Sequence, residues 1–376
     1  MNIKEVAEIR RHIRRDRSNM TAIYGCYVND NKEIISEFRS STGMMSENEG
    51  DKYFGLMRKV LSGTIGKHLI DISFKTSQVV DSSEHKLLME LRQSNLENEE
   101  LRMSFYRKVM ESVSLDQGYL ILLGCDSYDV PFKKEGHEET YKFLLCAICP
   151  VKLTKATLHY VPEEKLFHDG GITNVVANPE IGFLFPAFDD RATNIYNALY
   201  YTRSVKESQD AFADAIFHTQ IPKPAYTQKK SFEAILSNAL AEECSMDVVQ
   251  TVHEQLAQRI ELHKESKVPE ALVLSKEDVK DVLVGCGISD AHMAKFSVDY
   301  DEIFGFEADV YPKNIIDEKR FEVKLPDVSI KVAPDRTDLI ETRVIGGVKY
   351  ILINAEEDVE VNGVSIHIQD GTLSPV

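Results

Sequence analysis

The first 220 residues alternate between stretches with the two-residue periodicity of strands and stretches with the periodicity of helices. Leu101, Phe105, Val109 and Val113 recur every four positions, which is typical of an amphipathic helix over 97–113. The runs 118–131 and 139–151 are apolar on both faces, as expected of central strands. Because hairpin-like strands are interspersed with helices, the pattern predicts an α+β domain with a mostly antiparallel mixed sheet. Further elements are predicted as helices over 4–15 and 52–61, strands over 20–28, 32–38 and 67–74, and a hairpin over 157–168.

The second half of the chain changes character twice. Pro222 and Pro224 indicate a boundary, because paired prolines resist both helix and strand pairing. Apolar stripes then predict helices over 229–241, 246–263 and 290–304. We therefore expect an α+β domain over 1–220, a helical segment over 225–305 and a small acidic β module over 306–376.

Two hairpins are predicted in this last module, at 344–353 and 359–368. A turn at Asn362-Gly363 would pair Val361 with Val364, Val359 with Ile366, and Glu360 with Ser365. This register places apolar side chains on one face and polar side chains on the other. From Asp301 onward the chain has 16 acidic and 8 basic residues, so the module is strongly acidic.

Charge and composition limit the classes of protein to which this chain can belong. The chain has 376 residues, 43% of them hydrophobic, and a net charge of −17, which makes non-specific binding to nucleic acid unfavourable. Its apolar runs are shorter than the ~20 residues of a membrane helix, and the N-terminal segment lacks an apolar signal core. Six cysteines without dense spacing indicate reduced thiols. We expect a cytoplasmic globular protein with no membrane association.

The segment "FLFPAFDDR" offers the main candidates for chemistry. Asp190 stands where the N-cap of a helix is predicted, with apolar residues at 192, 195, 196 and 199 on one stripe. Capping explains one carboxylate, but not Asp189, Asp190 and Arg191 together. Asp126 and Asp129 also follow a central strand, so four carboxylates could hold Mg²⁺ or Mn²⁺. In that alternative, Arg191 would neutralise charge on a phosphoester substrate of a hydrolase. Both interpretations stay open.

Other motifs are incomplete. Cys146 and Cys149 have redox spacing but lie in a predicted strand, where positions three apart face opposite sides, so two buried thiols are expected. The segment 253–257 lacks the second histidine of a zinc protease helix. The segment 62–68 lacks the hydroxyl residue of a phosphate loop.

Five arginines gather near the N-terminus of this acidic chain. They are Arg10, Arg11, Arg14, Arg15 and Arg17, and their spacing predicts one basic face of a helix. Such a face could bind the protein's own acidic surface, a second subunit, or RNA.

The motifs taken together show a resemblance. The segments "GCYV", "LSGTIGK", "YLILL" with "YDVP", "ICPV", "FLFPAF" with "DR", and "HEQL" resemble a bacterial family known as domain of unknown function 4317. The resemblance implies a cytoplasmic bacterial protein and brings no activity, cofactor or catalytic residue. We expect a non-enzymatic binding or scaffold protein that acts through protein contacts or self-association and needs no cofactor. The metal-dependent hydrolase and an RNA- or ribosome-associated factor are the alternatives.

Overall fold

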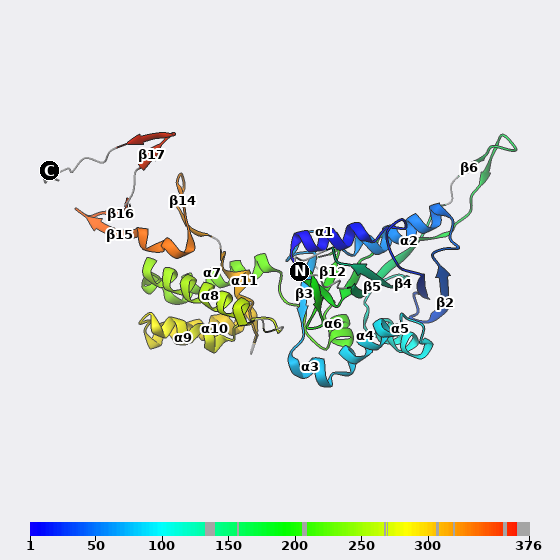
Figure 1. Ribbon diagram of the computed structural model, residues 1–376, viewed down its shortest axis with the longest axis horizontal. Helices are drawn as coiled ribbons and strands as arrows, with labels where there is room; N and C mark the ends of the chain where they lie inside the picture. Colours follow the sequence, from blue (N-terminus) through cyan, green and yellow to red (C-terminus); the bar gives the residue numbers. More distant parts are fainter. Residues whose placement is uncertain are drawn as a thin grey trace. The chain divides into compact units, whose positions relative to one another are not determined.

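The computed structural model describes residues 1–131, 140–155, 158–204, 209–266, 268, 270–305, 308–318, 320–355 and 359–366. The chain divides into two compact units. The N-terminal unit comprises Met1–Tyr226 with Val268–Ala271, and the C-terminal unit comprises Thr227–Lys267 with Leu272–Val376. Figure 1 shows the elements of each unit along the chain.

An antiparallel sheet forms the centre of the N-terminal unit. Its strands follow the order β2-β1-β4-β5-β9-β12-β3, and β8 pairs with the far end of β5. Every neighbouring pair runs antiparallel, which confirms the predicted fold class. The strands are β1 (Ala22–Val28), β2 (Ile34–Ser41), β3 (Leu69–Ser73), β4 (Tyr119–Asp129), β5 (Thr140–Leu153), β8 (Asn174–Val176), β9 (Ile181–Phe185) and β12 (Asn197–Thr202).

Helices cover both faces of this sheet, with α1 and α2 on one side and α4, α5 and α6 on the other (Figure 1). Two smaller hairpins, β6–β7 and β10–β11, complete the unit. The helices are α1 (Ile3–His12), α2 (Glu47–Lys59), α3 (Thr76–Asp81), α4 (Ser83–Gln93), α5 (Glu99–Ser112) and α6 (Asp210–Phe217). The hairpin strands are β6 (Leu158–Val161), β7 (Leu166–Asp169), β10 (Ala187–Asp189) and β11 (Ala192–Asn194).

Side chains of the central strands enter two hydrophobic cores in alternation. Along β5, Cys146 packs in the core under α4, α5 and α6, whereas Cys149 packs in the core under α1 and α2. Both thiols are free and buried, which confirms the interpretation of "CAIC". Burial raises the pKa of Cys149 to about 12 and that of Cys146 well above its ordinary value. Both side chains are therefore neutral packing groups at physiological pH.

The helix predicted after Asp190 is wrong. Asp190 and Arg191 form the two-residue turn between β10 and β11, with φ of 50° and 60° in the left-handed region. Residues 192–194 and 197–202 are strands, and β12 pairs with both β9 and β3. Leu199 and Tyr200 consequently enter opposite cores, as strand neighbours do. Asp190 therefore caps no helix.

The first helix is also shorter than predicted, because α1 ends at His12. Ile13 packs fully buried in the core, and Ser18 and Asn19 then bind Asp126, so the chain leaves the helical path. Only Arg10 and Arg11 of the five arginines are therefore helical. Arg14, Arg15 and Arg17 lie beyond the end of α1, so the prediction that all five arginines share one helix face is wrong for these three.

The C-terminal unit has its own hydrophobic core, built from α7 to α11. Its helical elements are α7 (Ala225–Leu240), η1 (Ala241–Glu243), α8 (Met246–Ser266), α9 (Lys276–Gly285), α10 (Asp290–Phe304), α11 (Pro312–Ile315) and η2 (Pro334–Leu339). Its strands are β13 (Phe321–Lys324), β14 (Ser329–Val332), β15 (Ile340–Ile345), β16 (Val348–Ile353), β17 (Val359–Val361) and β18 (Val364–Ile366).

Within the described residues, the C-terminal strands form three two-stranded hairpins. The last hairpin has the predicted register, with Val361 opposite Val364, Val359 opposite Ile366, and Glu360 opposite Ser365. The other predicted hairpin closes at Gly346-Gly347, where both glycines have positive φ. Both hairpin predictions at this end of the chain are confirmed as far as the described residues extend.

Candidate functional site

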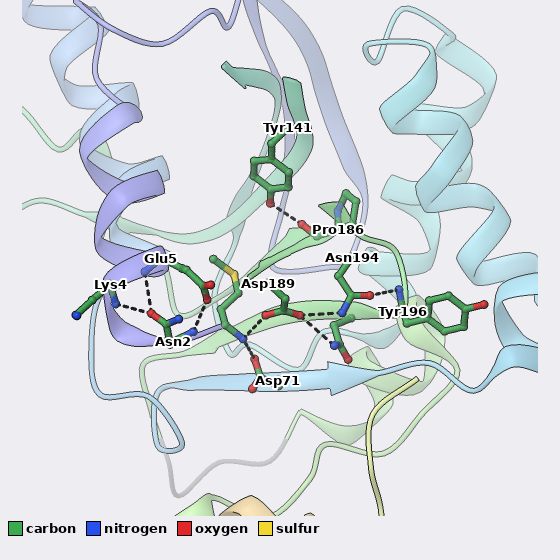
Figure 2. A network of polar contacts seen from close by, with 11 residues as sticks. Asn2, Lys4, Glu5, Asp71, Tyr141, Pro186, Asp189, Asn194 and Tyr196 are labelled. Atoms are coloured by element: carbon green, nitrogen blue, oxygen red, sulfur yellow. Dashed lines mark hydrogen bonds and ion pairs between the residues drawn. The ribbon is translucent and has the colours of Figure 1, made fainter. Parts of the chain in front are cut away.

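The candidate residues near the N-terminus lie around α1, whose first turn is held by a capping box. Asn2 Oδ1 accepts hydrogen bonds from the backbone N–H of Lys4 (2.9 Å) and Glu5 (3.1 Å). Glu5 Oε2 in turn accepts the backbone N–H of Asn2 (2.7 Å). Glu5 is buried, and this burial raises the pKa of its carboxyl. Figure 2 shows this turn beside Asp71 and Asp189.

Asp189 holds the start of α1 against the sheet. The amino group of Met1 lies 2.7 Å from Asp189 Oδ1 and 3.0 Å from Asp71 Oδ1. The other oxygen of Asp189 accepts hydrogen bonds from the side-chain amides of Asn194 (2.9 Å) and Asn197 (3.1 Å) (Figure 2). Charge-assisted bonds of this kind are stronger than neutral ones. The Asp189 carboxylate thus connects the first residue of the chain with β11 and β12.

Arg191 projects from the β10–β11 turn to the same helix. Its Nη1 lies 2.8 Å from Glu8 Oε2, and its Nη2 donates to the Pro131 carbonyl at 3.2 Å. Glu8 Oε1 accepts the hydroxyl of Tyr128 at 2.7 Å. Burial, followed by this bond to Glu8, raises the pKa of Tyr128 to about 12. Arg191 therefore neutralises a carboxylate of the chain itself.

Asp126 forms a second, separate network at the end of β4. The residue is 3% exposed, and its carboxylate accepts hydrogen bonds from Ser18 Oγ (2.6 Å) and from the backbone N–H of Asn19 (2.9 Å) and Ser127 (2.7 Å). His12 Nε2 lies 3.3 Å from Asp126 Oδ1, at an angle unsuited to a hydrogen bond. The network fastens the turn after α1 to the sheet.

Asp129 differs from Asp126 in its surroundings. It is exposed, and among the described residues it accepts a hydrogen bond from Thr140 Oγ1 at 2.9 Å. Within the described ranges, no three His, Cys, Asp or Glu side chains gather in a way that could hold a metal ion. Asp126 and Asp189 are each surrounded by hydrogen-bond donors of their own network.

The five arginines are all exposed, and several form local ion pairs. Arg15 Nη1 lies 3.2 Å from Glu47 Oε1. Asp16 lies between Arg14 (3.0 Å) and Arg17 (3.8 Å). At these exposures such pairs contribute little to stability, so the arginine side chains can exchange partners.

A second candidate surface lies on the last two hairpins of the C-terminal unit. Gln250 of α8 donates to the carbonyls of Thr337 (2.9 Å) and Ile340 (3.3 Å), which fixes the start of β15. Beyond this point, large apolar side chains are exposed. They are Val344, Ile345, Val348, Tyr350 and Ile353 on β15–β16, and Val361, Val364 and Ile366 on β17–β18.

The comparisons with known proteins identify the family. The family model described as Domain of unknown function (DUF4317) matches residues 1–364. The chain belongs to this family. No curated protein and no solved structure matches it. In the part of the chain that the structure describes, no helix combines the length and apolar character needed to cross a bilayer.

Several residues that hold this DUF4317 chain together were not predicted from the sequence. They are the amino group of Met1, Asp71 and Glu8. The Asn2-x-x-Glu5 pattern was a signal for the helix start, because it is a capping-box sequence. No local pattern marks Asp71 as a partner of Met1, since the two are 70 positions apart.

Proposed function

We propose that this DUF4317 protein is a non-enzymatic binding protein that contacts a protein partner through the hairpins β15–β16 and β17–β18. One observation carries this proposal. The alternation of β17–β18 places apolar side chains on one face, and such a face is usually buried. Here this face is exposed, with Val361 50% and Val364 63% accessible. An apolar hairpin face of this kind, when uncovered, is typical of an interaction surface.

A partner is expected at these hairpins because a two-stranded hairpin is only marginally stable alone in water. Each of the two hairpins pairs with no further strand among the described residues. A partner that adds a strand to an edge, or covers the apolar face, would supply the missing burial. The alternation of Val359, Val361, Val364 and Ile366 on one face provides a row of contacts for it.

Charge favours a basic partner. Residues 350–376 contain five acidic residues and no lysine or arginine. Two copies of this segment would repel each other, whereas an extended basic segment of another protein would be attracted. The proposed partner is therefore a protein with a Lys/Arg-rich segment that also carries apolar side chains.

Placing a charge on the apolar face should remove this binding. We expect Val364→Asp to reduce the recovery of specific partners from native lysate about tenfold or more, because the new carboxylate would have to be desolvated at the contact. The measurement is quantitative mass spectrometry of proteins retained by the immobilised full chain.

The matched control is Ser365→Asp, which adds the same charge on the opposite face of the same hairpin. It should retain the partners of the wild type. Equal recovery with the wild type, Val364→Asp and Ser365→Asp would contradict the proposal, provided circular dichroism shows all three folded.

A further inference from the structure

The pairing of the end of β5 with β8 and the pairing within the hairpin β6–β7 share one antiparallel register. Val151 lies opposite Val176 and Leu153 opposite Asn174 in β5–β8. Thr154 and Thr173 then exchange backbone and side-chain hydrogen bonds. The β6–β7 pairs, from Leu158 opposite Asp169 to Val161 opposite Leu166, continue in the same register. We call the described residues of 151–176 the arm, which includes the hairpin labelled β6 in Figure 1.

The arm exposes apolar side chains on both faces. Tyr160 and Phe167 lie opposite each other with ring centroids 5.2 Å apart, and they are 52% and 65% exposed. Leu166 (59% exposed) and Leu153 (71%) occupy the other face. Strands β6, β7 and β8 each have one neighbouring strand among the described residues. The arm therefore has both apolar faces and backbone edges available for a partner.

Charges along the arm are divided between its two ends. The end nearest the sheet has Lys152 and Lys155 and no acidic residue, which gives +2. The distal end, 158–169, has Glu163, Glu164 and Asp169 against Lys165, which gives −2. The arm as a whole is neutral, although the chain carries −17. Two arms can approach each other without the repulsion expected between two copies of the acidic segment.

We propose that the arms of two copies of this chain pair side by side in opposite directions. A twofold axis would then place the −2 distal end of each arm against the +2 end of the other, while the apolar side chains of both become covered. A parallel arrangement would put like charges together. The charge distribution thus selects a second copy, in one orientation, as the occupant. This inference is independent of the surface proposed for the basic partner.

Reversing the charge at one end tests this arrangement. Glu163→Lys with Glu164→Lys makes both ends of the arm positive, and Lys152→Glu with Lys155→Glu makes both ends negative. Each pair of changes should raise the dimer dissociation constant about tenfold, because like charges would then meet. All four changes in one chain restore opposite ends and should restore dimerisation. Sedimentation velocity of the full chain at several concentrations measures the dissociation constant.

The four residues are exposed, so these variants should fold like the wild type. Val364→Asp, which alters the C-terminal hairpin, should leave the dissociation constant unchanged. A wild-type chain that stays monomeric at every concentration would overturn the proposal. So would a four-residue variant that associates no better than the two partial ones, or a dimer lost on Val364→Asp.

Discussion

Replacing Gly182 by alanine is expected to destabilise the N-terminal unit by about 3 kcal/mol. Gly182 lies in the buried strand β9, opposite Ala147 and Tyr201. An added Cβ would approach the backbone carbonyl of Cys146 to 2.5 Å and both methyl groups of Val60 to 2.8 Å. Because one obstacle is backbone of the neighbouring strand, relief requires β5 and β9 to move apart. Chemical denaturation followed by circular dichroism measures the change.

Gly55→Ala is the matched control for this effect. Gly55 lies in α2, and nothing lies within 4 Å of the position its Cβ would occupy. Alanine should therefore stabilise the helix by about 0.5–1 kcal/mol, through its better helix propensity. A Gly182→Ala protein as stable as the wild type would contradict the close packing of β9 against β5 and Val60.

Replacing Asp126 by alanine is expected to cost about 3 kcal/mol of unfolding free energy. The substitution removes the acceptor of three hydrogen bonds, from Ser18, Asn19 and Ser127, in a site that is almost fully buried. The three donors left behind lose the carboxylate that accepts their hydrogen bonds. The midpoint of urea denaturation measures the loss, with the slope of the transition as a check on the compactness of the unfolded state.

The comparison is with Asp129→Ala, three residues along the same strand. Asp129 is exposed, and the hydrogen bond that it accepts from Thr140 is also exposed, so its loss should change stability by no more than about 0.5 kcal/mol. Equal effects of the two substitutions would show that the network around Asp126 does not fasten the turn after α1.

Strand β5 and the hairpin β17–β18 could be predicted because their patterns are local. Alternation along β5 indicated opposite directions for Cys146 and Cys149, and the two cores confirm it. The Asn362-Gly363 turn determined the register of β17–β18, because these residues favour the positive φ that a two-residue hairpin turn needs.

The turn at Asp190 and Arg191 could not be predicted in the same way. Aspartate tolerates positive φ, but arginine seldom adopts it, so the pair Asp190-Arg191 lacks the glycine that is typical of a hairpin turn of this kind. The apolar positions that followed matched a helical stripe, although strand pairing with β9 and β3 determines their conformation. Tertiary pairing overrode the local periodicity here.

The roles of the candidate aspartates depend on partners that are distant in sequence. Asp126 binds Ser18 across 108 positions, and Asp189 binds the amino group of Met1. The sequence showed carboxylates at strand ends and could not show which donors the fold brings to each. Asp126 and Asp129 look equivalent in the sequence, yet one is buried among donors and the other faces water.

Hydrogen exchange of the C-terminal hairpins tests most directly whether they are binding surfaces. In the purified chain, the amides of β15–β16 and β17–β18 should exchange quickly, because isolated hairpins open readily. In the complex recovered from native lysate, the same amides should exchange more slowly, while those of β4 and β5 remain unchanged. Unaltered exchange at both hairpins in a complex that contains a bound partner would contradict the proposed function.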